Sequence, residues 1–171
     1  MSDIQRVRIT HVVTGKSLFV TDNEALPLGK SCDVSALFAA NPIIRKRGDW
    51  QWNSIPNTGE LHGFLNTFSN GRLWFGEHDE QADARAAISW NSNDSGTIDD
   101  LSIVAEPLGN NIYYLKWNSG TVEWDNHGNN GDGYLFIFPE ATGNASKVFW
   151  ARKEDHPADD DSFKFKIESI S

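Results

Sequence analysis

Short apolar and aromatic stretches alternate with polar turn residues along the whole chain. The stretches are rich in β-branched and aromatic side chains, and Gly, Asn, Asp and Pro separate them. No window of a dozen residues repeats apolar positions at the three-to-four spacing of an amphipathic helix. The pattern therefore predicts an all-β protein. The predicted strands include 6–13, 17–21, 64–68, 72–75, 112–117, 147–151 and 162–167.

A threefold repeat runs through this pattern. Gly15, Gly71 and Gly120 each supply the tight turn of a hairpin, and an apolar residue precedes each of them by six positions. A further apolar strand and a closing strand follow each hairpin at nearly constant spacing. The spacing predicts one domain over 1–171 with three units of four strands. The units cover 4–56, 57–107 and 108–171.

Three such units about a common axis resemble the β-trefoil, a six-stranded barrel capped by three hairpins. The resemblance lies in pattern and spacing and covers the whole chain. It implies that the closing strands, such as 50–52 and 163–165, complete the barrel, and their alternation of apolar and polar residues is typical of half-buried strands. A β-sandwich of nine or ten strands is the alternative, because sandwiches also show short strands with regular turns.

Charge and composition narrow the classes of partner. The chain of 171 residues has 15 basic and 24 acidic residues, a formal net charge of −9. Nucleic acid and anionic membrane surfaces both require a basic footprint, so we expect neither as a partner. No apolar run approaches the length of a membrane span, and no signal-type stretch opens the sequence, so we expect a cytoplasmic protein without membrane insertion. The single cysteine, Cys32, excludes an internal disulfide framework.

The third unit departs most from the repeat, because its second and third strands lie furthest apart in sequence. The extra length begins with a polar, glycine-rich segment that ends at Gly133. Loops that depart from a repeat are where binding residues concentrate. We therefore predict that this loop contributes ligand-binding side chains from Asp125, Asn126, His127 and Asn129.

Strand alternation selects a second group of candidates. If Phe19, Phe75 and Trp124 point inward, we expect their neighbours Leu18, Trp74 and Glu123 to point outward. Trp74 would then be exposed beside Glu77 and His78. By the same alternation Trp150 is expected to be exposed. An exposed indole beside carboxylate or imidazole groups is typical of carbohydrate sites, since the ring stacks on apolar sugar faces while the polar groups bind hydroxyls.

Catalytic and metal-binding patterns are weak. The five histidines lack metal-ligand spacing, and no nucleophile elbow or phosphate-binding glycine loop is present. The loop after Trp124 departs from a calcium loop, with Asn130 at the position that requires glycine and Phe136 at the position that requires glutamate. We expect no catalytic residue, no metal and no cofactor, and hence a protein that is not an enzyme.

Acidic, tryptophan-rich β-trefoils without disulfides resemble the fungal cytoplasmic lectins. The resemblance implies a defence-related carbohydrate-binding protein whose partners are glycans or glycoproteins, and it leaves a homodimer open. The ricin-type Q-x-W signature is absent: the nearest stretch is Trp50-Gln51-Trp52. The alternative is a protease inhibitor, similar to the plant Kunitz and mushroom cysteine-protease inhibitors, that presents a loop such as 23–29 to a protease cleft.

Overall fold

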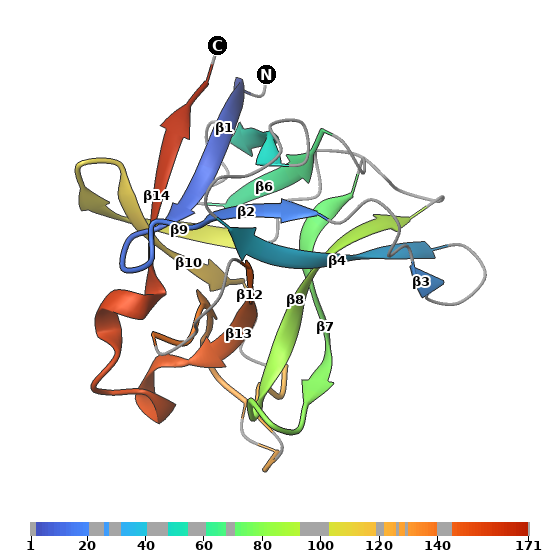
Figure 1. The fold of residues 1–171 in the computed structure, drawn as a ribbon, viewed down its shortest axis with the longest axis vertical. Coiled ribbons are helices and arrows are strands. Elements are labelled where there is room, and N and C mark those ends of the chain that lie inside the picture. The colour runs from blue at the N-terminus through green and yellow to red at the C-terminus, as the bar shows by residue number, and fades with distance from the viewer. Residues whose placement is uncertain are drawn as a thin grey trace.

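The structure is a computed structural model, and the part of it described here is built from β-strands. It describes residues 3–20, 26–27, 32–40, 48–54, 61–67, 71–92, 103–118, 122–125, 127–128, 130–139 and 145–170. Two short 3-10 turns, η2 (Lys153–Asp155) and η3 (Asp160–Phe163), precede the last strand (Figure 1). The strands are β1 (Asp3–His11), β2 (Ser17–Val20), β3 (Leu26–Pro27), β4 (Cys32–Ala40), β5 (Trp50–Ser54), β6 (Leu61–Asn66), β7 (Arg72–Asp79), β8 (Ala84–Ser92), β9 (Ile103–Gly109), β10 (Ile112–Trp117), β11 (Gly133–Phe136), β12 (Ala145–Lys147), β13 (Phe149–Arg152) and β14 (Lys164–Ser169).

The strands close into an antiparallel barrel. β1 pairs with β5 and with β14, β5 pairs with β6, β6 with β9, β9 with β10, and β10 with β14, which completes a ring. A longer closed path leaves this ring through β2, β4, β8 and β7. Closure leaves the ring without a free edge strand, which removes the unpaired backbone groups that an open sheet exposes.

Three hairpins extend from the barrel: β2 with β4, β7 with β8, and β11 with β13. They also pair with one another, since β8 contacts both β4 and β13 and β12 contacts β4. In Figure 1, β7 and β8 run together to a turn at the lower end of the view. This turn, at residues 80–83, borders both hollows described below.

The expectation of an all-β protein is confirmed. The pairings establish a closed antiparallel barrel rather than the expected β-trefoil, and they do not confirm the alternative β-sandwich. Apolar periodicity indicates where strands begin and end, but hydrogen bonds between residues distant in sequence decide which strand edges meet. Among the described residues no helix is long and apolar enough to cross a membrane.

Tryptophan and phenylalanine side chains fill the core. Trp50 and Trp124 are fully buried, and Trp52 packs half-buried against the same cluster. A second cluster contains Phe136, Phe149 and Phe163. Core packing thus accounts for much of the high aromatic content.

The predicted strand faces are only partly correct. Trp124 is buried and Glu123 exposed, as alternation predicts. In β2, however, Leu18 is fully buried and Phe19 only half-buried, the reverse of the prediction. Alternation predicts that neighbouring residues face opposite ways, but the position of the barrel decides which way is inside.

The expected exposure of Trp150 is wrong. β13 lies between β8 and β11, and the Trp150 indole is fully buried beside the Trp117 and Trp124 rings, whose centroids are 5.7 and 6.2 Å away. Its Nε1–H donates a hydrogen bond to the backbone carbonyl of Trp74 at 3.0 Å. Trp74 is itself half-buried against the core. A central strand covered on both faces leaves no outward side for an indole.

Candidate functional site

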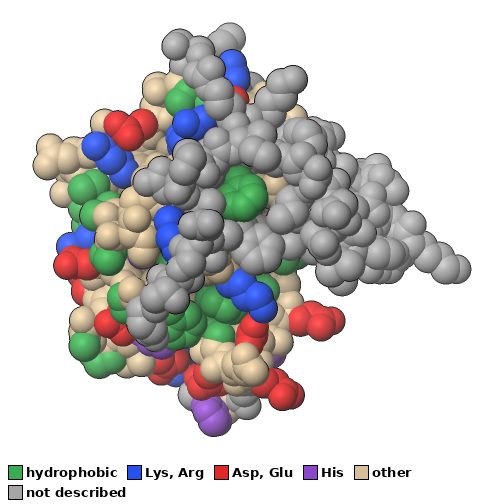
Figure 2. All heavy atoms as spheres, in the orientation of Figure 1, with side chains coloured by type: hydrophobic (Ala, Val, Ile, Leu, Met, Phe, Trp, Pro, Cys, Tyr) green, Lys and Arg blue, Asp and Glu red, His purple; other side chains and the backbone are tan. Residues whose placement is uncertain are grey.

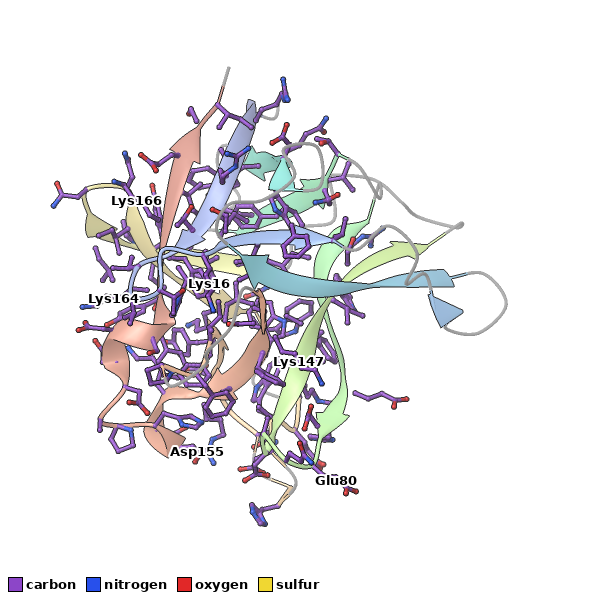
Figure 3. The ribbon with its side chains drawn as sticks, in the orientation of Figure 1. Lys16, Glu80, Lys147, Asp155, Lys164 and Lys166 are labelled. Carbon is purple, nitrogen blue, oxygen red and sulfur yellow. The ribbon has the colours of Figure 1, made fainter. Side chains whose placement is uncertain are left out.

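A polar hollow opens between the end of β7 and the segment that follows β10. Its volume is about 610 Å³, and it is lined by His78, Glu80, Glu123, Asp125 and Gly128. Figure 3 labels Glu80 at the turn between β7 and β8. In Figure 2, acidic side chains and a histidine gather at the same lower edge of the molecule. We call this feature the polar hollow.

The backbone carbonyl of Glu123 ties the two sides of the polar hollow together. It accepts hydrogen bonds from His78 Nε2–H at 2.9 Å and from Arg85 Nε–H at 2.6 Å. Arg85 also donates from Nη1 to the carbonyl of Gly76 at 2.9 Å, which fixes the guanidinium against β7. His78 carries a proton on Nε2 in this arrangement, so the Nδ1 atom is the position at which a neutral imidazole accepts a hydrogen bond.

Asp125 orders the loop beneath the polar hollow. Its carboxylate is 3% exposed, accepts a hydrogen bond from the His127 backbone N–H at 2.9 Å, and lies 3.6 Å from Arg152. Arg152 also contacts Glu154 at 2.9 Å and Asp155 at 3.5 Å. Burial lowers the pKa of Arg152, but the surrounding carboxylates outweigh it and raise the pKa of this guanidinium above its ordinary value. Arg152 therefore faces the buried Asp125 side chain as a permanent cation.

The loop folds back around the Trp124 indole. The Nε1–H of Trp124 donates a hydrogen bond to the carbonyl of Gly131 at 2.8 Å. A Cβ atom at Gly133 would lie 2.6 Å from Cζ2 of the same indole and closer still to two other ring atoms. Gly128 and Gly131 have positive φ angles of 77° and 121°, which favour glycine. A buried tryptophan and three glycines therefore set the path of this wall.

The structure brings two of the predicted ligand-binding residues into the polar hollow, His78 and Asp125. Glu77 is exposed on β7 but does not line it. His127 is 72% exposed and lies 3.3 Å from Asp83.

The two tryptophan candidates do not line the polar hollow. Trp74 is half-buried against the core and Trp150 is fully buried, so neither lines it. Asn126 and Asn129 lie outside the described residues.

Two residues of the polar hollow, Glu80 and Glu123, were not selected from the sequence. The sequence contained a feature that could have indicated each of them. Glu80 stands two positions after His78, so alternation places both on one face. Glu123 was expected to point outward as the neighbour of Trp124, and its side chain is exposed. Among the described residues, no group of three or more His, Cys, Asp or Glu side chains could hold a metal ion.

Comparison with known proteins gives a likeness in fold. No protein-family model and no curated protein matches the sequence. A Caenorhabditis elegans protein of unknown function is similar in structure, with a TM-score of 0.63 and 11% identity, over 99% of this chain and 96% of that one. The SDF2-like protein from Arabidopsis thaliana gives a TM-score of 0.61 and 13% identity, over 98% of this chain and 94% of that one.

A salivary protein from Culex quiquefasciatus, of the Cysteine and Tryptophan-Rich family, is also similar, with a TM-score of 0.58 and 13% identity over 99% of this chain and 96% of that one. At this identity the likeness concerns the fold alone. The expected assignment to the fungal cytoplasmic β-trefoil lectins is wrong, because the similar structures are SDF2-like and Cysteine and Tryptophan-Rich proteins. Short strands with glycine turns recur in unrelated families, so the sequence pattern could not identify the family of this chain.

Proposed function

We propose that the protein is a non-catalytic carbohydrate-binding protein and that the polar hollow is its sugar site. The observation that carries the proposal is the convergence of His78, Glu80 and Glu123 on one open hollow, from segments about 45 residues apart in sequence. A volume of about 610 Å³ lies in the range of small-ligand sites, roughly 300–1,000 Å³.

The chemistry of the lining favours a ligand with several hydroxyl groups. Carboxylate oxygens and the Nδ1 atom of neutral His78 accept hydrogen bonds, and hydroxyl groups can donate them in several directions. Hydrogen bonds to a charged carboxylate are also stronger than those between neutral groups. The polar lining gives an apolar ligand no partner, and the carboxylates repel an anionic one.

The rigidity of the lining supports the same proposal. The Glu123 carbonyl holds both His78 and Arg85, and Arg152 orients Asp125. Binding therefore requires little ordering of the backbone, which lowers its entropic cost.

A glycan array followed by calorimetric titration with the best glycan tests the proposal. In a double variant, Glu80→Gln with Glu123→Gln, the charge is removed while the backbone carbonyl of residue 123 remains. We expect this variant to bind the glycan at least about tenfold more weakly, since it loses charge-assisted hydrogen bonds. The control is Glu168→Gln, which removes an exposed carboxylate from β14, a strand that contributes no residue to the polar hollow.

Two outcomes would overturn the proposal. One is wild-type protein that retains no glycan on the array, and the other is a double variant that binds as tightly as wild type. A papain-like and a trypsin-like protease assayed in parallel test the protease-inhibitor alternative. The loop expected to serve that function, 23–29, lies outside the described residues apart from Leu26–Pro27.

We also infer that the barrel is composed of three units of four strands. In support, the first strand of each unit pairs with its last: β1 with β5, β6 with β9, and β10 with β14. Each unit also contributes one of the three hairpins. A crystal structure in which the three units superpose would support this inference, and one in which any of the three first-to-last pairings is missing would refute it.

A further inference from the structure

A second hollow lies on the opposite side of the β7–β8 turn from the polar hollow. Its volume is about 430 Å³, and it is lined by Asp79, Gln81, Ala82, Phe138, Lys147 and Phe149. The two hollows share no lining residue: His78 and Glu80 line the polar hollow, whereas Asp79 and Gln81 line this one. We call this feature the aromatic hollow. Figure 3 labels Lys147 near the turn that carries Glu80.

The apolar wall of the aromatic hollow is a fixed phenylalanine ring. Phe138 is half-buried, and three aromatic rings pack against it with their planes nearly perpendicular to its own. The ring centroids of Phe136, Phe149 and His156 lie 4.8, 5.5 and 5.5 Å from that of Phe138, at interplanar angles of 75°, 77° and 85°. A ring held in this way is already ordered, so a ligand in the hollow that contacts it pays little entropic cost on binding.

The polar edge of the aromatic hollow carries one acceptor and one donor. Oδ1 of Asp79 accepts the backbone N–H groups of Gln81 and Ala82 at 3.0 and 3.1 Å, which fixes the carboxylate within the turn. Its Oδ2 lies 3.7 Å from Lys147 Nζ. This distance is too long for a direct hydrogen bond, so both groups retain hydrogen-bonding capacity toward a ligand between or beside them.

The charges of this pair determine the class of ligand. Asp79 and Lys147 nearly cancel, so neither an anion nor a cation is selected by net charge. A ligand that satisfies both needs an adjacent donor and acceptor, and it must also have an apolar face for Phe138. A pyranose ring fulfils all three conditions, because vicinal hydroxyls lie on its edge and C–H groups on its face.

We propose that the aromatic hollow is a second saccharide site, selective for a neutral pyranose that stacks on Phe138 and places vicinal hydroxyls on Asp79 and Lys147. The class of ligand rests on the proposed function, but the residues are separate from those of the polar hollow. Two sites on one chain would allow a branched or surface-bound glycan to bind with avidity.

Nuclear magnetic resonance of the full chain tests this proposal with four probes, the methyl glycosides of glucose, galactose, mannose and N-acetylglucosamine, each titrated separately. The aromatic signals of Phe138 are assigned by their loss in Phe138→Leu. We expect at least one glycoside to shift them saturably, and Lys147→Gln to weaken that binding about tenfold through loss of a charge-assisted hydrogen bond. Lys166→Gln is the matched control, because Lys166 also lies 3.6 Å from a carboxylate on the surface.

The failure of this proposal can be told apart from failure of the proposed function. If no glycoside shifts Phe138, or if Lys147→Gln binds as tightly as wild type, the second site is refuted. Saturable shifts of Phe138 that persist in the Glu80→Gln, Glu123→Gln variant support two independent sites. Loss of those shifts in that variant shows one shared site and refutes this inference while leaving the proposed function in place.

Discussion

Replacing Gly133 with alanine tests how the wall of the polar hollow is built. Gly133 begins β11, directly over the Trp124 indole. A Cβ atom there would lie 2.6 Å from Cζ2 of the ring, a separation that real Cβ atoms essentially never show. The obstructing atoms belong to a rigid, fully buried side chain, so either the indole or the strand must move.

The expected loss in the free energy of unfolding can be estimated from the contacts that such a movement would disturb. Trp124 packs against Phe75 and Trp150 at centroid distances of 5.6 and 6.2 Å, and its Nε1–H is bonded to Gly131. Overpacking a core costs about 1–3 kcal/mol, and a buried donor left without its acceptor costs a similar amount. Reduced entropy of the unfolded chain offsets up to about 1 kcal/mol. We therefore expect the free energy of unfolding to fall by about 2–4 kcal/mol, and Tm by roughly 5–15 °C for a domain of this size.

Urea unfolding followed by tryptophan fluorescence measures this change. Gly76→Ala is the matched control, since its Cβ would approach Cγ2 of Ile88 to 3.1 Å, and that methyl group can yield. The Ala86 carbonyl oxygen would lie at an ordinary contact distance of 3.6 Å. We expect the control to lose less than about 1 kcal/mol. If Gly133→Ala unfolds at the same urea concentration as Gly76→Ala, the described packing of glycine on indole is wrong.

Three further predictions concern buried or bonded aromatic groups. Trp150→Ala should cost about 3–5 kcal/mol of unfolding free energy, because it empties a fully buried site; retention of the wild-type urea midpoint would contradict this. Burial lowers the pKa of His11 below the 6.5 of an exposed histidine. As the pH falls below about 6.5, the unfolded chain therefore binds a proton at this residue before the folded chain does, and the free energy of unfolding should decrease. Urea midpoints at pH 7.5 and 5.5 test this, with His11→Gln expected to show a smaller difference than wild type. The Tyr114 hydroxyl donates to Asp160 at 2.7 Å and lowers the pKa of that carboxyl, so Tyr114→Phe should raise it in a carbon-detected titration; an unchanged value would show that the bond does not form in solution.

Local features of the fold follow from the sequence, because they depend on neighbouring residues. The predicted strand at 112–117 coincides with β10 (Ile112–Trp117), and the predicted strand at 17–21 begins at the same residue as β2 (Ser17–Val20). The turn at Gly15 has a positive φ of 70°, as a tight hairpin turn favours. Backbone propensity and turn chemistry act over a few residues, so they can be read from the chain itself.

The tertiary structure decided which side chains are buried and which ones meet. Trp150 was expected outside and lies inside, because β8 and β11 flank its strand and other indoles cover it. Glu80 and Glu123 share a hollow although 43 positions separate them along the chain. No local pattern encodes either fact, since burial and proximity depend on which distant strands pair and on how the barrel closes. Sequence periodicity determined that this protein is built of short strands, and long-range pairing alone determined which side chains line its two hollows.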